Sequence, residues 1–128
     1  FEENQEFYLV QEFIAGHSLT KEIGSGKQLT EAQVVNLLQD ILKVLEFVHE
    51  QHVIHRDLKP SNLIRRYKDC EIVLIDFGAV KQISAPLMDS PDDTKGDTNL
   101  TIAIGSPGYM PNEQLAGTPQ FSSDIYAV

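Results

Sequence analysis

The stretch from Thr30 to Gln51 constrains the fold more than any other part of the sequence. Thr30 and Gln33 make a capping box, in which a threonine side chain and a glutamine three residues later satisfy the first N–H groups of a helix. Apolar side chains then recur at helical spacing to the end of the stretch. The pattern predicts one long amphipathic helix that packs against the rest of a domain through Val34, Leu37, Leu38, Ile41, Leu45 and Val48.

The residues before this helix predict a strand and a short helix. Residues 6–14, EFYLVQEFI, are rich in aromatic and β-branched residues, which favours a strand that runs into a turn at Ala15-Gly16. Ser18 and Gly24 are typical of the start and the end of a short helix. Several aromatic residues outside the motifs described below are interpreted as core residues, namely Phe13, Phe47, Phe121 and Tyr126.

The residues after the long helix predict small hairpins and one long loop. Lysine-proline and lysine-aspartate pairs separate the β-rich runs and supply their turns. From Gln82 to Asn99 the sequence becomes polar and rich in serine, proline and aspartate, which predicts a loop within the domain. Together with the long helix, these elements predict an α+β fold. The β-rich runs are HVIH at 52–55, NLIRR at 62–66 and EIVLIDF at 71–77.

Length and composition exclude several classes of protein. A chain of 128 residues can bury the core of one domain but not of two. Its net charge of −9 argues against binding to nucleic acid or to anionic membrane surfaces, and no run reaches the roughly 18 apolar residues that a membrane-spanning helix needs. The single cysteine, Cys70, fits a reducing compartment, so we predict a cytoplasmic location. Because the chain runs from Phe1 to Val128 without a polar tail, we interpret it as a piece of a longer protein.

Polar residues with complementary chemistry follow the long helix. Asp57 stands in a loop after a rigid element, where a carboxylate can accept a proton from an approaching alcohol. Lys59 can neutralise charge on a transferring group, and Asn62 offers a neutral oxygen suited to Mg²⁺. A second carboxylate, Asp76, follows the apolar run IVLI. Phosphoryl transfer requires such a base, a cation and metal-holding oxygens, since its catalysis is mainly positioning and charge neutralisation.

Ordered motifs resemble those of the protein kinase family. HRDLKPSN at 55–62, DFG at 76–78 and GSPGYMPNEQ at 105–114 resemble the catalytic loop, the metal loop and the substrate-facing end of the activation segment. The lysine two residues after the aspartate is similar to serine/threonine kinases, and GYMPNEQ is similar to bacterial, in particular cyanobacterial, members. The resemblance implies transfer of the γ-phosphoryl group of ATP, with Mg²⁺, to serine or threonine of a protein substrate.

The resemblance also implies a fold and a division of the chain. We expect part of a kinase catalytic domain, with a mainly α-helical C-terminal lobe and short β-hairpins. Residues 1–16 would be the last strand of the N-terminal lobe and the hinge, and residues 17–128 an incomplete C-terminal lobe. The activation segment would span residues 76–113.

Individual roles follow from the resemblance for matching residues. Asp57 would be the catalytic base, Lys59 would contact the transferred phosphate, and Asn62 with Asp76 would hold Mg²⁺. In the nucleotide pocket, Gln11 would be the gatekeeper, and Glu12 and Ile14 would offer backbone hydrogen bonds to adenine. Ile64 would form the apolar floor, and Ser18 falls at the ribose position.

Further residues would regulate or support the site. Arg56 marks kinases that are switched on by phosphorylation of the activation loop, for which Ser90, Thr94, Thr98 and Thr101 are candidates and Thr98 and Thr101 are favoured. Ser106 keeps the hydroxyl that bonds the catalytic aspartate and lysine. The resemblance also makes His55 and Phe77 stacking partners and makes Asp124 the buried aspartate that braces the catalytic loop.

Two departures from the family pattern affect what the chain would do alone. The family's Ala-Pro-Glu is Pro111-Asn112-Glu113 here, which keeps the glutamate and displaces the proline. The glycine-rich phosphate loop, the β3 lysine and its glutamate precede the hinge in the family. GSGKQL at 24–29 lies after the hinge and is interpreted as an ordinary loop. We therefore expect the 128 residues alone to be inactive.

Other interpretations fit the sequence less well. Histidines at 49, 52 and 55 invite a metal site, but helix-end and core positions fit them better because no suitable further ligands are near. A pseudokinase-like module that binds ATP or a partner without turnover is the main alternative function, and a small-molecule phosphotransferase is another. The intact Asp57, Asn62 and Asp76 disfavour the first, while Arg56 and the Lys-Pro pair disfavour the second. The protein substrate and the oligomeric state stay open.

Overall fold

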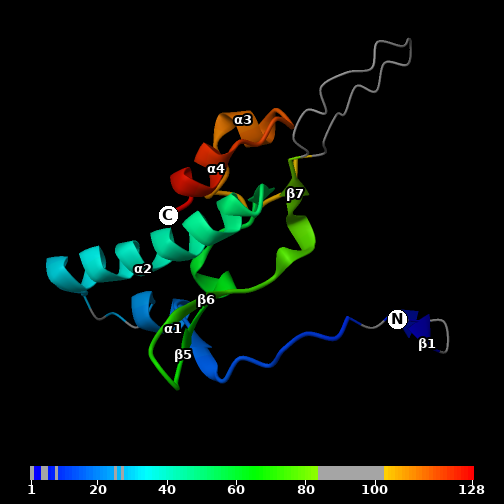
Figure 1. Cartoon of the computed structure of the whole chain (residues 1–128). Helices are drawn as coiled ribbons and strands as arrows, with labels where there is room; N and C mark the ends of the chain where they lie inside the picture. The colour runs from blue at the N-terminus through cyan, green and yellow to red at the C-terminus, as the bar shows by residue number, and fades with distance from the viewer. Residues whose placement is uncertain (1, 4–5, 8, 25, 27, 84–102) are drawn as a thin grey trace, which may run out of the picture.

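The computed structural model describes residues 2–3, 6–7, 9–24, 26, 28–83 and 103–128. Helix α2, Glu31–Glu50, runs through the centre of the molecule, with a small sheet on one side and the short helices α3, Asn112–Leu115, and α4, Phe121–Tyr126, on the other (Figure 1). This mixture of helices with a few short strands confirms the predicted α+β class. The predicted loop at 82–99, apart from its first two residues, lies outside the described residues.

Helix α2 begins and ends as its sequence predicts. The Thr30 hydroxyl accepts the Gln33 N–H at 3.3 Å, and the Gln33 side chain accepts the Thr30 N–H at 2.9 Å, so both halves of the capping box are present. The helix is capped at its other end by Gln51. Its core-facing residues pack with residues of the short strands and of the segment 55–62. Together they form one hydrophobic cluster of Leu19, Ile41, Leu45, Val48, Leu58, Leu63, Ile72 and Leu74.

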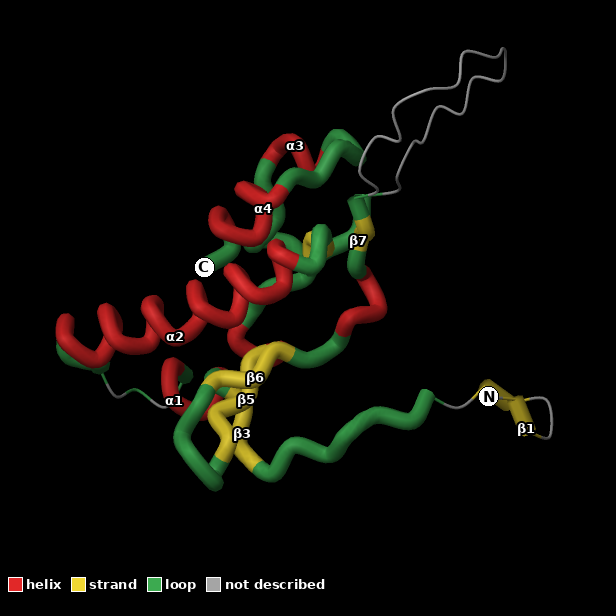
Figure 2. Tube along the Cα trace, in the orientation of Figure 1, coloured by secondary structure: helices red, strands yellow, loops and turns green. Residues whose placement is uncertain are grey.

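A three-stranded antiparallel sheet packs beside α2, with β5 in its centre (Figure 2). Gly16 pairs with Arg66 across the β3–β5 boundary, and a Cβ on Gly16 would lie 2.4 Å from the Arg65 carbonyl oxygen, so only glycine fits there. The β5–β6 hairpin confirms the predicted turn near residues 68–69. The strands are β3, Gly16–Ser18; β5, Leu63–Arg66; and β6, Ile72–Leu74.

Two-residue strands form the remaining pairs. β4, Val53–Ile54, pairs with β7, Lys81–Gln82, and so brings the chain after the DFG motif back to the end of α2. β1, Glu2–Glu3, pairs with β2, Glu6–Phe7, and this hairpin lies apart from the body of the molecule (Figures 1 and 2). Two 3₁₀ turns lie at the sequence motifs: η1, Pro60–Asn62, ends the HRDLKPSN motif, and η2, Phe77–Ala79, begins within the DFG motif.

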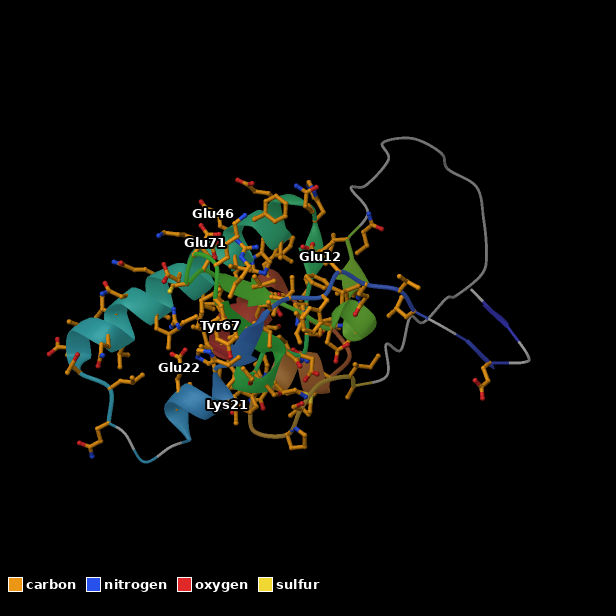
Figure 3. All side chains as sticks on the ribbon, turned by 90° about the horizontal axis from the view of Figure 1, so that it is seen from below. Glu12, Lys21, Glu22, Glu46, Tyr67 and Glu71 are labelled. Atoms are coloured by element: carbon orange, nitrogen blue, oxygen red, sulfur yellow. The ribbon has the colours of Figure 1, made fainter. Side chains whose placement is uncertain are left out.

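Helix α1, Thr20–Ile23, ends at Gly24 as predicted, but its N-cap is Leu19 because Ser18 belongs to β3. The helix is joined to the sheet by Glu22, which is labelled in Figure 3. Its carboxylate accepts hydrogen bonds from Arg65 Nε at 2.6 Å and Nη2 at 3.1 Å. The ring of His17 adds a contact to Glu22 Oε1 at 2.6 Å and lies 5.6 Å from the ring of Tyr67. Hydrogen bonds from Arg65, opposed by partial burial, lower the pKa of Glu22.

The predicted strand over residues 6–14 is present at Glu6–Phe7 but wrong at residues 9–14. Residues 9–15 have no regular secondary structure, because in the described part of the chain no neighbouring strand pairs with them. Their apolar side chains are largely exposed, Phe13 at 89%.

Most of the aromatic core predictions are also wrong. Phe47 and Tyr126 are each 65% exposed, and Phe121 is half-buried against the ring of His49 at 4.9 Å. Phe47 follows the buried Leu45 by two residues, which on a helix turns its side chain to the opposite face.

Among the described residues, no helix is both long and apolar enough to cross a bilayer.

Candidate functional site

The site is built on the loop that follows β4, residues 55–62, which we call the 55–62 loop. Its backbone is held from α4 by Asp124, whose side chain is fully buried. The Asp124 carboxylate accepts the N–H groups of His55 and Arg56, each at 2.9 Å, and a hydrogen bond from His49 Nε2 at 2.9 Å. The brace expected of Asp124 is therefore present, and His49 on α2 completes it.

Asp57 lies at the centre of a hydrogen-bonded group. The Ser106 hydroxyl donates to Asp57 Oδ1 at 2.7 Å and accepts from Lys59 Nζ at 2.7 Å. Lys59 Nζ also lies 3.1 Å from Asp57 Oδ2. The Asn62 amide donates to Asp57 Oδ2 at 3.2 Å and to the Asp57 carbonyl at 2.8 Å. The structure thus brings together four of the residues singled out from the sequence, from two segments far apart in the chain.

These contacts set the ionisation of Asp57. Partial burial raises the pKa of its carboxyl, but the hydrogen bonds from Ser106, Lys59 and Asn62 outweigh burial and lower the pKa below its ordinary value. Asp57 is therefore ionised at neutral pH, with both oxygens already oriented by donors. A carboxylate so placed can orient a hydroxyl group and accept its proton.

Asp76 reaches the same region through backbone contacts. The Ile75 N–H donates to the Asn62 carbonyl at 2.9 Å, and His55 Nε2 lies 3.1 Å from the Ile75 carbonyl oxygen, so the residue next to Asp76 is tied to the 55–62 loop. Asp76 itself has a left-handed backbone, with φ of 64°, and its exposed carboxylate accepts the Gly78 N–H at 3.4 Å.

His55 and Phe77 stack as expected. Their ring centroids lie 5.0 Å apart with the ring planes at 80°, an edge-to-face contact. His55 is completely buried, which places it in the core and agrees with the core interpretation of this histidine.

A cavity of about 640 Å³ lies beside Asp76 and Phe77. Its volume falls in the range of about 300–1,000 Å³ that is usual for small-molecule sites. Its lining holds four of the five residues predicted to contact a nucleotide, together with the metal-loop motif. The lining residues are Leu9, Gln11, Glu12, Phe13, Ile14, Ile64, Ile75, Asp76, Phe77 and Gly78.

The fifth predicted nucleotide contact, Ser18, is elsewhere. It lies in β3, and its hydroxyl donates to the Pro60 carbonyl at 3.0 Å. A separate cavity of about 340 Å³ under α1 and α2 is lined almost entirely by apolar side chains, with Lys59 at its edge. Such a lining does not suit a polyphosphate, so the cavity beside Asp76 is the candidate site.

Arg56 is buried, and its guanidinium group hydrogen-bonds backbone carbonyl groups of the same chain. Its Nε donates to the Ala79 carbonyl, and its Nη2 donates to the Val80 carbonyl at 3.2 Å. Burial lowers the pKa of the Arg56 guanidinium, although the charge of Asp124 opposes this, and the group stays charged at neutral pH. The predicted phosphorylation sites Thr98 and Thr101, as well as Ser90 and Thr94, lie outside the described residues.

Two residues at the site were not singled out for it from the sequence. His49 lies one helical turn beyond Leu45, on the apolar face of α2. A polar residue on a buried helix face is the sequence signal that could have identified it. Gln114 is 3% exposed and donates from Nε2 to the carbonyl oxygens of Arg56 and Ile104, each at 2.6 Å. Nothing in the local sequence pattern indicates that role.

Known proteins match the chain along its whole length. Serine/threonine-protein kinase B of Synechocystis sp. is 48% identical over 128 residues, which cover 99% of this chain and 22% of that protein. Serine/threonine-protein kinase PknA of Nostoc sp. is 44% identical over 128 residues, covering 100% of this chain and 22% of that protein. The chain therefore spans less than a quarter of the length of these relatives. The family model described as protein kinase domain matches residues 1–128, and the chain belongs to the protein kinase family.

Proposed function

We propose that this chain forms part of a serine/threonine protein kinase, which transfers the γ-phosphoryl group of ATP to serine or threonine of a protein substrate. The observation that carries the proposal is the group around Asp57, in which Ser106, Lys59 and Asn62 hold the carboxylate. The names of the cyanobacterial relatives support the same activity.

Asp57 and Lys59 would act on the two reacting groups. Asp57 orients the substrate hydroxyl and accepts its proton, and its lowered pKa keeps it ionised for that task. Lys59 lies between Asp57 and Ser106, so its ammonium group is held where it can approach the phosphoryl group as the hydroxyl attacks. Both side chains are partly buried, where the electrostatic interactions of their charges with a bound group are stronger than in water.

Asn62 and Asp76 fit the chemistry of a Mg²⁺ site. The side-chain nitrogen of Asn62 donates to Asp57, so the amide oxygen of Asn62 points away from Asp57. Asp76 adds an exposed carboxylate beside the cavity, and hard oxygens of these two kinds are the ligands that Mg²⁺ takes. When bound, Mg²⁺ would neutralise phosphate charge.

The cavity beside Asp76 would hold the nucleotide. Gln11 would stand at the back of the pocket as gatekeeper, Glu12 and Ile14 would offer backbone groups to adenine, and Ile64 would form the apolar floor. All four line the cavity. The contact proposed for Ser18 has no such support, because its hydroxyl is bonded to Pro60.

The remaining parts of the proposal concern the whole protein. Residues 1–16 would form the hinge side and residues 17–128 the C-terminal lobe, with the activation segment at 76–113. Phosphorylation at Thr98 or Thr101 would act through Arg56. The cytoplasmic location stays a prediction from the single cysteine.

The proposal is tested by Asp57→Asn in the full-length protein that contains this chain. Removing a general base lowers rates about 10²- to 10⁴-fold, so we expect incorporation of labelled phosphate into a generic protein substrate to fall by that factor. Asp40→Asn makes the same chemical change at an exposed ion pair on α2 and should leave incorporation unchanged. Near-normal incorporation in Asp57→Asn would reject the role of Asp57. A wild-type protein that binds ATP without incorporation would favour the pseudokinase-like alternative.

A further inference from the structure

Gln114 lies in α3, outside the group that surrounds Asp57, and is almost completely buried. Its Nε2 atom donates to two backbone carbonyl oxygens, those of Arg56 and Ile104, at 2.6 Å each. Because both partners only accept hydrogen bonds, the side-chain NH₂ group and not the amide oxygen must face them. One side chain thus joins the 55–62 loop to the segment that leads into Ser106.

The bond to Arg56 acts on the peptide that begins Asp57. Arg56 has a left-handed backbone, with φ of 68°, which a residue other than glycine keeps only when its surroundings hold it there. Asp124 accepts a hydrogen bond from the Arg56 N–H at 2.9 Å, and Gln114 donates one to the Arg56 carbonyl oxygen at 2.6 Å. Since that carbonyl lies in the same peptide plane as the Asp57 nitrogen, holding its direction fixes where Asp57 starts.

The bond to Ile104 acts on the segment that carries Ser106. Gly105 stands between the two, with φ of +146°. A Cβ at Gly105 would lie 2.5 Å from Gln114 Nε2 and 2.7 Å from Met110 Cγ, so the close approach of this segment to Gln114 needs glycine. Ser106 then donates to Asp57 Oδ1 at 2.7 Å. Gln114 and Ser106 therefore hold Asp57 from its backbone and from its side chain.

We propose that Gln114 is a positioning residue, which couples the placement of residues 104–106 to the orientation of Asp57. The inference rests on the proposed function, because the effect of Gln114 is read through Asp57. The contacts form a closed ring that runs from the Arg56 carbonyl through Gln114 to Ile104, and then through Ser106 back to Asp57. Loss of either link opens this ring and leaves Lys59 and Asn62 as the remaining contacts of Asp57 described above.

The test is a double-mutant cycle in the full-length protein with Gln114→Met and Ser106→Ala. Methionine keeps the length of the side chain but has no N–H donor. Misplacing a reacting group costs up to about 10²-fold, so we expect Gln114→Met to lower kcat by about 10- to 100-fold, per molecule that binds a non-hydrolysable ATP analogue. If both residues act on Asp57 through one ring, the double variant should lose little more than the more affected single variant.

Gln39→Met is the matched control, because Gln39 is exposed on α2. It should keep the wild-type kcat. If Gln114→Met does not fold, as judged by loss of analogue binding, Gln114→Asn replaces it in the same cycle, since a side chain shorter by one methylene group reaches one carbonyl at most. An unchanged kcat, or single effects that multiply in the double variant, would overturn the inference while leaving the kinase activity in place. A wild-type protein without phosphoryl transfer would instead remove the proposed function.

Discussion

The 55–62 loop and residues 9–14 are both functional segments by their sequence, yet they are held very differently. In the 55–62 loop, side chains from α3 and α4 hydrogen-bond the backbone, and Leu58 is 2% exposed in the core. Residues 9–14 have no regular secondary structure, and the side chains of Leu9, Val10 and Phe13 are exposed. The residue that follows them, Ala15, is held by a backbone hydrogen bond, which the Tyr67 N–H donates to the Ala15 carbonyl oxygen at 2.9 Å.

The difference shows that a functional sequence and a stable local structure are separate properties. The 55–62 loop is part of the hydrophobic core and of a buried polar network, so a change there affects folding and chemistry together. Residues 9–14 line the cavity but contribute little buried apolar surface, so a change there affects ligand binding with little effect on stability. The predictions below, made for the full-length protein, test that separation.

The largest loss of stability is expected for Asp124→Ala. The substitution leaves the buried N–H groups of His55 and Arg56 without their acceptor. Each unsatisfied group costs about 1–3 kcal/mol, so the free energy of unfolding should fall by about 2–6 kcal/mol, measured by urea denaturation. Asp69→Ala, which removes an exposed ion pair with Arg66, should change it by about 1 kcal/mol or less. Equal effects of the two substitutions would mean that Asp124 does not brace the 55–62 loop.

A matched pair of apolar substitutions compares the two segments directly. Leu58→Ala removes a core side chain and should lower the free energy of unfolding by about 2–5 kcal/mol. Phe13→Ala changes a side chain that is 89% exposed and should alter it by about 0.5 kcal/mol or less. Phe13 also lines the cavity, so the affinity for ATP, measured by calorimetry, should fall in Phe13→Ala. A large loss of stability in Phe13→Ala would contradict the comparison.

The same contrast explains what the sequence could predict. The capping box at Thr30 and the spacing of apolar residues act locally, so both ends of α2 are where they were predicted. The motifs at 55–62 and 76–78 contain His55 and Phe77, whose rings meet in space as expected, because a family resemblance carries tertiary information that local patterns lack. The hydrogen bonds of Ser106 to Asp57 and Lys59 were found in this way.

The failures share a physical cause. The β propensity of residues 9–14 does not make a strand without a partner strand, which propensity alone does not reveal. Phe47 was placed in the core by residue type, although its helical position faces away from Leu45. Gln114 bonds carbonyl groups that lie 58 and 10 residues away in the chain, and backbone acceptors leave no mark in the sequence.

The smallest predicted effect concerns the pH dependence of stability. Partial burial raises the pKa of Asp57, but hydrogen bonds from Ser106, Lys59 and Asn62 together lower the pKa by more than burial raises it. The folded pKa therefore lies below the unfolded value of about 3.9. Between these two pKa values the unfolded chain binds more protons, and stability rises with pH. The contribution of Asp57 is therefore complete above about pH 5 and is lost as the pH falls through the folded pKa.

Asp57→Asn isolates this contribution, because it removes the titrating group and leaves Glu22, whose pKa is also lowered, in both proteins. The free energy of unfolding of the wild type minus that of Asp57→Asn should therefore decrease as the pH is lowered from about 5 to about 3. The measurement is urea denaturation of both proteins across that range. A difference that stays constant or grows toward low pH would mean that the donors around Asp57 do not favour its charged form. In that case the 55–62 loop would be held by its backbone contacts alone, and the polar network around Asp57 would add nothing to its stability.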